Sequence, residues 1–143
     1  FEINKSIIYN LQKNLKNNST KFKIYSGNLL LNLNQKKKYY FENKNFLATS
    51  LYRESNKKLK LKNYYYKSIP NLKKFNTLII DGEGIEEHYL NNINKLPNIK
   101  YLIFEFHNDI FINLEKIELF RKLKKNKFVL KDKFINSYYF EKI

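Results

Sequence analysis

Polar side chains of the kind used in proton transfer follow two apolar runs of the sequence. Asp81 and Glu83 come directly after the run LII, and Glu105 and His107 end a second run, YLIFEF. Side chains two positions apart on a strand point to the same side, so each pair would project together. If the two runs are neighbouring strands, three carboxylates and an imidazole converge at one edge of a sheet. Such a group could take the proton of a substrate hydroxyl or hold a divalent cation.

The stretch TLIIDGEGIEEHYL, residues 77–90, contains the elements that would position the first pair. Its apolar run predicts a short buried parallel strand. After the acidic, glycine-containing turn, Ile85, Tyr89 and Ile93 share one face of a predicted helix. Ligands of open α/β sheets bind along the carboxyl edge of the strands, which makes Asp81 and Glu83 candidates for chemistry. The alternative is that Asp81 caps this helix, while Glu83 and Glu86 complement its N-terminus.

The elements predicted for the second half alternate between strand and helix. YLIFEF predicts another buried strand, residues 114–123 a helix, and residues 127–130 and 137–140 a closing pair of strands. Glu105 within a buried run needs a partner or a function. His107 is either functional or a hydrogen-bonded turn residue, and His88 is expected to face solvent. This alternation predicts an α/β fold with a mainly parallel sheet and an antiparallel C-terminal strand pair.

The first half is expected to belong to the same single domain, residues 1–143. The end of a strand at Phe1 leads into a helix with Asn4 as its N-cap, and the apolar stripe of that helix is formed by Ile7, Ile8, Leu11 and Leu15. Alternation over residues 22–26 predicts a strand that Gly27 and Asn28 close. Residues 29–75 are expected to be an irregular or β-hairpin insertion, with short strands at 29–33 and 39–41.

The composition narrows the classes of partner and site. The net charge is +15, but lysine supplies nearly all of it, Arg53 and Arg121 being the only arginines. Specific readers of nucleic acid favour arginine, so we expect no specific nucleic-acid partner and only weak polyanion binding. The absence of cysteine excludes thiolate metal sites and disulfides. No apolar run is long enough to span a membrane and no signal-peptide pattern opens the chain, which indicates a cytoplasmic protein.

Four segments together resemble the FkbM-type family of S-adenosylmethionine-dependent methyltransferases. LIIDGEGIEEHYL (78–90) is similar to the strand–IDVEG-x-E–helix signature of the family, and YLIFEFH (101–107) to its next strand, which ends in Glu-x-His. FINSYYF (134–140) is similar to the closing strand, and residues 1–18 to the second strand and the following helix. The resemblance implies an incomplete Rossmann-like methyltransferase sheet.

The resemblance also implies an activity and a role for each candidate residue. The protein would be an S-adenosylmethionine-dependent O-methyltransferase acting on a hydroxyl of a sugar, a glycan or another small molecule. Glu2 would hold the ribose hydroxyls of the cofactor, and Asp81 would lie near its methyl-donating end or the acceptor oxygen. Glu83, Glu105 and His107 would line the acceptor pocket, one of them as general base. No residue is assigned as a metal ligand, although metal dependence and the oligomeric state are left open.

The sequence departs from the family pattern in three places. Ile79 replaces the usual lysine, and Gly82 replaces a β-branched residue. The glycine-rich loop that should precede Phe1 is missing from the sequence, and the glycines present (Gly27, Gly82 and Gly84) do not form a G-x-G-x-x-G motif. The chain contains no methionine. We therefore expect a truncated methyltransferase domain that binds the cofactor poorly and is inactive by itself.

Two other functions fit part of the sequence. An apolar strand ending in Asp81-x-Glu83 resembles the acidic motif with which many glycosyltransferases hold a nucleotide sugar through a divalent cation. A non-enzymatic basic α/β module that binds RNA or another polyanion would explain the charge, with Tyr64, Tyr65 and Tyr66 available for stacking. Those tyrosines are also expected in strands and in the core.

Overall fold

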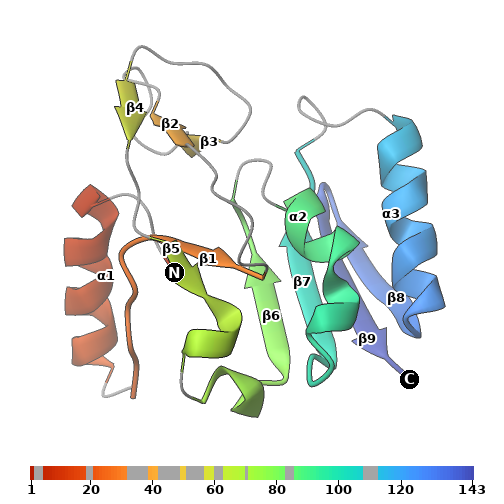
Figure 1. Ribbon diagram of the computed structural model, residues 1–143, viewed down its shortest axis with the longest axis horizontal. Coiled ribbons are helices and arrows are strands. Elements are labelled where there is room, and N and C mark those ends of the chain that lie inside the picture. The colour runs from red at the N-terminus through yellow and green to blue at the C-terminus, as the bar shows by residue number, and fades with distance from the viewer. Residues whose placement is uncertain are drawn as a thin grey trace.

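The computed structural model describes Phe1 and residues 5–18, 21–31, 39–41, 49–50, 57–59, 63–69, 71–82, 86–107 and 113–143 (Figure 1). The α-helices are α1 (Lys5–Asn17), α2 (Glu86–Asn91) and α3 (Asn113–Lys125). Short 3-10 helices lie at η1 (Tyr66–Ser68), η2 (Leu72–Lys74) and η3 (Ile93–Lys95). The fold class is mixed α/β.

A four-stranded sheet forms the C-terminal half of the molecule. Its strands are β6 (Thr77–Ile80), β7 (Tyr101–Glu105), β8 (Phe128–Phe134) and β9 (Ser137–Lys142), in the order β6-β7-β9-β8. β6 and β7 are parallel, whereas β9 is antiparallel to both of its neighbours. The predicted antiparallel C-terminal pair is confirmed. The sheet is mixed rather than mainly parallel, because the tight turn after β8 returns β9 between β8 and β7.

One face of this sheet is buried. Because side chains alternate along a strand, Leu102 and Phe104 of β7 both point to the buried face, where they have almost no exposed surface. Phe104 stacks on Tyr138 and Phe140 of β9, with ring centroids 5.5 and 5.8 Å apart. Figure 1 shows α2 and α3 side by side in front of the sheet. These helices and strands share one apolar core, to which α3 contributes Leu119 and Leu123.

The opposite face of the sheet is open over the described residues. Ile79 of β6 and Ile103 of β7 are register partners there, with exposed fractions of 68% and 37%. They alternate with the buried partners Ile80 and Phe104. The sheet is therefore covered on one side only by the described part of the chain.

The N-terminal half contains shorter elements. The predicted apolar stripe of α1 is confirmed, since Ile7, Ile8, Leu11 and Leu15 are all partly buried. The strand predicted over residues 22–26 is wrong: residues 21–25 lie in no strand, and β1 (Asn28–Leu30) begins after Gly27. The lysines at 21 and 23 line a cavity together with Phe22, so this alternation does not reflect sheet pairing.

Segment 29–75 has strands in two small sheets. β1 pairs in parallel with β5 (Asn63–Tyr65), and β2 (Tyr39–Phe41) lies between β3 (Thr49–Ser50) and β4 (Lys57–Leu59) in an antiparallel sheet. The strand predicted at 39–41 is thus present as β2. Tyr64 and Tyr66 pack against the core, as expected for core tyrosines.

A candidate acid–base site at the ends of two parallel strands

The candidate site lies where the parallel strands β6 and β7 end. Ile80 pairs with Phe104, so the residues that follow them, Asp81 and Glu105, lie at the same level: Asp81 comes directly after β6, and Glu105 is the last residue of β7. His107 is two positions beyond Glu105. The potential ligand atoms of Asp81, Glu105 and His107 all lie within 4.8 Å of one another. The predicted convergence of two strand ends is therefore confirmed for these three residues.

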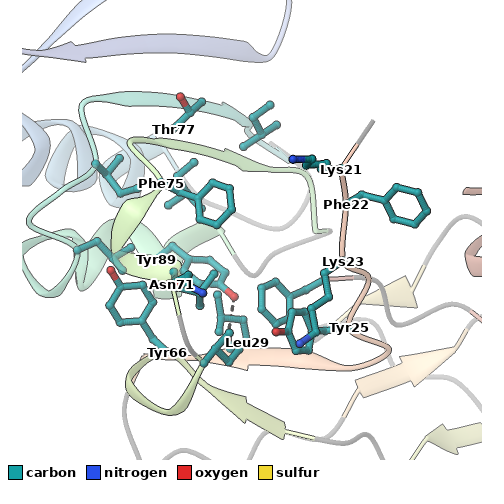
Figure 2. A pocket seen from close by; sticks show the side chains of 17 residues that line it. Lys21, Phe22, Lys23, Tyr25, Leu29, Tyr66, Asn71, Phe75, Thr77 and Tyr89 are labelled. Carbon is teal, nitrogen blue, oxygen red and sulfur yellow. Dashed lines mark hydrogen bonds between the residues drawn. The ribbon is translucent and has the colours of Figure 1, made fainter. Parts of the chain in front are cut away.

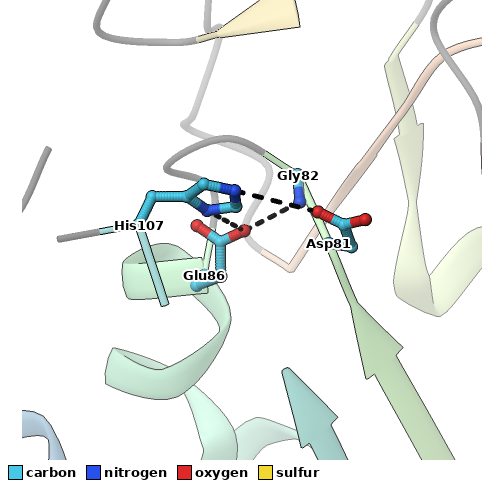
Figure 3. Close-up of polar contacts among 4 residues, drawn as sticks. All are labelled: Asp81, Gly82, Glu86 and His107. Carbon is cyan, nitrogen blue, oxygen red and sulfur yellow. Dashed lines mark hydrogen bonds and ion pairs between the residues drawn. The ribbon is translucent and has the colours of Figure 1, made fainter. Parts of the chain in front are cut away.

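Each ring nitrogen of His107 has a neighbouring carboxylate (Figure 3). Its Nε2 is 3.9 Å from Oδ1 of Asp81, and its Nδ1 is 3.5 Å from Oε1 of Glu86. The Asp81 side chain is 69% exposed, while the Glu86 side chain has no exposed surface. His107 therefore has a buried acidic neighbour at one ring nitrogen and a solvent-accessible acidic neighbour at the other.

Glu86 is the site residue that sequence reasoning missed. It is the first residue of α2, and its Oε1 accepts a hydrogen bond of 2.7 Å from the backbone N–H of Gly82. This contact fixes the turn after β6 to the start of the helix. A signal was present in the spacing, because Glu86 shares the helix face of Leu90 and Ile93, both of which are buried. An acid on the apolar face of a helix needs a partner in the interior.

Two predicted site residues, Glu2 and Glu83, lie outside the described residues, as do Ile85 and the predicted N-cap Asn4. The predicted solvent-facing position of His88 is wrong, since its exposed fraction is 5%. The reason is that α2 is covered on more than one side: Glu86, Tyr89 and Leu90 are buried as well. The His88 ring packs edge-on against Tyr89, with centroids 5.3 Å apart.

A separate cavity of about 690 Å³ is lined in part by β6 and shares no lining residue with the His107 cluster (Figure 2). Its walls come from β6, β1, η2 and the segment 21–25, and most of its lining is apolar. At one wall the buried hydroxyl of Tyr89 donates a 2.7 Å hydrogen bond to the carbonyl of Leu29, and burial raises the pKa of this tyrosine. Among the described residues, the lining includes Lys21 and Lys23 but no acidic residue.

S-adenosylmethionine, the cofactor implied by the resemblance, does not fit a complete site among the described residues. Nucleotide-binding α/β folds use an acid for the ribose and a glycine-rich turn for the rest of the ligand. The described lining of the cavity contains no such acid, the sequence contains no G-x-G-x-x-G turn, and Glu2 is outside the described residues.

Within the described part of the chain, every helix is too short or too polar to cross a bilayer. Comparison with protein-family models, curated proteins and solved structures found no match to this chain.

Proposed function

We propose that this chain is the acceptor-binding part of an S-adenosylmethionine-dependent O-methyltransferase acting on a hydroxyl of a sugar, a glycan or another small molecule. The observation that carries the proposal is the position of His107, with carboxylates on both sides, at the carboxyl ends of two parallel strands. Binding at this edge is the rule for open α/β sheets. The resemblance of segments 78–90 and 101–107 to the methyltransferase signature supports the choice of reaction.

His107 is the general base in this proposal. The Glu86 carboxylate near Nδ1 favours the tautomer that carries its proton there, which leaves Nε2 as the acceptor. The hydroxyl of the substrate would donate to Nε2 and transfer its proton to it as the oxygen becomes nucleophilic. Glu86 would then stabilise the imidazolium, as the buried acid does in other acid–histidine pairs. A positioned base of this kind contributes about 10²- to 10⁴-fold in rate.

Asp81 and Glu105 orient the acceptor. Ionised carboxylates accept hydrogen bonds only, so they suit neighbouring hydroxyls of a polyhydroxylated substrate. Asp81 is mostly exposed and close to Nε2 of His107, where it would hold the reacting hydroxyl or the one beside it. Cofactor binding is assigned to Glu2 and to parts of the protein outside the described residues.

The test uses the full-length protein, S-adenosylmethionine labelled in its methyl group and a panel of sugar and small-molecule alcohols. Label should appear in an acceptor, and His107→Ala should lower kcat at least 100-fold. Glu118→Gln, which changes an exposed acid of α3, should leave kcat unchanged. Absence of S-adenosylmethionine binding to the full-length protein in calorimetry would overturn the proposal.

A second candidate is a metal-dependent glycosyltransferase. It is favoured by the proximity of ligand atoms from Asp81, Glu105 and His107. Binding of a nucleotide sugar that requires a divalent cation, without binding of S-adenosylmethionine, would select this function instead.

A further inference from the structure

We propose that Asp81, Glu105 and His107 form a binding site for a first-row divalent metal ion such as Mn²⁺ or Zn²⁺. The inference goes beyond the proposed function and does not depend on it, since the three residues would bind an ion without cofactor or acceptor. The arguments are the spacing of the ligand atoms, the local charge and the way His107 is held.

The spacing of the ligand atoms matches a shared ion. Nitrogen and oxygen ligands lie about 2.1 Å from Zn²⁺, so two ligands of one ion are at most about 4.2 Å apart. Nε2 of His107 and Oδ1 of Asp81 are 3.9 Å apart, within that limit. All three ligand atoms lie within 4.8 Å of one another, so a shift of less than about 1 Å brings the widest pair into range.

The negative charges around His107 also favour binding of a cation. Three carboxylates, those of Asp81, Glu86 and Glu105, surround one imidazole. Among the described residues, the ion-pair partner of Asp81 is His107, and Glu105 has no ion-pair partner. Like charges at this separation disfavour one another unless a cation compensates them. This local excess of negative charge stands out in a chain whose net charge is +15.

Glu86 supplies the support that metal-binding histidines usually have. A ligating histidine generally faces a carboxylate or carbonyl with its other ring nitrogen, which fixes the tautomer and the ring orientation. Glu86 lies 3.5 Å from Nδ1 of His107, the ring nitrogen that does not face Asp81. Its position is fixed in turn by full burial and by the hydrogen bond from Gly82. Nε2 is thereby directed toward the accessible carboxylate of Asp81.

The donor set selects the class of metal. One imidazole with two carboxylates favours Mn²⁺, Fe²⁺, Co²⁺ or Zn²⁺ over Mg²⁺ and Ca²⁺, which prefer oxygen ligands alone. Three protein ligands leave coordination positions open, as in catalytic rather than structural sites. A bound ion would occupy Nε2 and would itself acidify a coordinated hydroxyl, replacing His107 as the group that activates the acceptor.

The test measures binding of Mn²⁺ alone by electron paramagnetic resonance and of Zn²⁺ alone by calorimetry, with no cofactor or acceptor present. Saturable binding of one ion per chain is expected, and it should raise the melting temperature. Asp81→Asn, Glu105→Gln and His107→Gln should each weaken binding at least 10-fold. Glu118→Gln should bind like the wild type, because that acid lies on α3 in an ion pair with Lys122.

Three outcomes would overturn the inference. The first is no saturable binding at millimolar metal, and the second is equal weakening in Glu118→Gln. The third is binding that survives in all three ligand variants, each checked for folding by circular dichroism. Failure of metal binding is distinguished from failure of the proposed function by a separate measurement of methyl transfer in the presence of a chelator. Metal binding without transfer would leave the ion site standing and remove the methyltransferase.

Discussion

The carboxylate of Glu86, which has no exposed surface, lies 3.5 Å from Nδ1 of His107. The same carboxylate accepts the backbone N–H of Gly82 at 2.7 Å. One buried side chain thus connects the end of β6, the start of α2 and the residue that follows β7. This contact positions His107 whether it acts as a base or as a metal ligand.

Two substitutions at Glu86 separate its structural role from its charge. Glu86→Ala removes the acceptor of the partly buried Gly82 N–H and should lower the free energy of unfolding by about 1–3 kcal/mol. Glu86→Gln keeps an acceptor oxygen and should cost less, while it removes the charge next to His107. Urea denaturation measures both variants. An alanine variant as stable as the glutamine variant would contradict the hydrogen bond as a stabilising contact.

The loss of charge in Glu86→Gln should also appear in catalysis. If His107 is the base, kcat should fall by about 10²-fold or more, since the imidazolium loses its stabilising acid. KM for the acceptor should change little because Glu86 is buried and does not reach the substrate. Steady-state kinetics of the full-length protein give both constants. A rise in KM with unchanged kcat would contradict this positioning role.

Neighbouring residues of β7 should differ strongly in their contribution to stability. Leu102→Ala should lower the free energy of unfolding by about 2–5 kcal/mol, because the side chain is fully buried and leaves a cavity. Ile103→Ala should cost less than about 1.5 kcal/mol, because the side chain points to the open face and is 37% exposed. Denaturation of the two variants under the same conditions provides the comparison. Equal losses would show that the second face is also covered.

The hydroxyl of Tyr89 should contribute to the free energy of unfolding. Tyr89→Phe removes the 2.7 Å hydrogen bond to the carbonyl of Leu29 and should lower the free energy of unfolding by about 1–3 kcal/mol. Tyr9→Phe is the matched control, because Tyr9 is 71% exposed on α1. Thermal and urea unfolding at pH 7 should separate the two variants. An unchanged stability of Tyr89→Phe would show that the contact between α2 and β1 contributes nothing.

The raised pKa of Tyr89 gives this contact a pH dependence. Burial favours the neutral phenol in the folded chain, so the unfolded chain loses this proton at lower pH than the folded one. The stabilisation is therefore complete below the ordinary tyrosine pKa of about 10 and declines above it. Tyr89→Phe should show a shallower loss of stability between pH 9 and about 11 than Tyr9→Phe does.

The strongly patterned second half of the chain was predictable from the sequence. Apolar runs and helix spacing predicted β6, β7, α3 and the closing hairpin, and the positions of Asp81 and Glu105 at the ends of two apolar runs predicted their convergence. The burial of His88 was not anticipated, because it depends on which elements cover α2, and the helix spacing that indicated burial of Glu86 did not identify His107 as its partner. Side-chain periodicity does not contain that tertiary information. The alternation over residues 22–26 gave a wrong strand for the same reason, since Phe22, Lys23 and Tyr25 line a cavity and residues 21–25 lie in no strand.

The high positive charge should give polyanion binding that is independent of the candidate site. At +15, heparin or nucleic acid should bind at low salt, with affinity falling steeply as salt rises because the binding is driven by counterion release. Asp81→Ala should leave this binding unchanged within about twofold, since one carboxylate at the end of β6 contributes little to the electrostatic field of the whole chain. Fluorescence anisotropy with labelled oligonucleotides of different sequences at several salt concentrations measures it. A strong sequence preference that persists at physiological salt would contradict the expectation and favour a nucleic-acid-binding function over the enzyme.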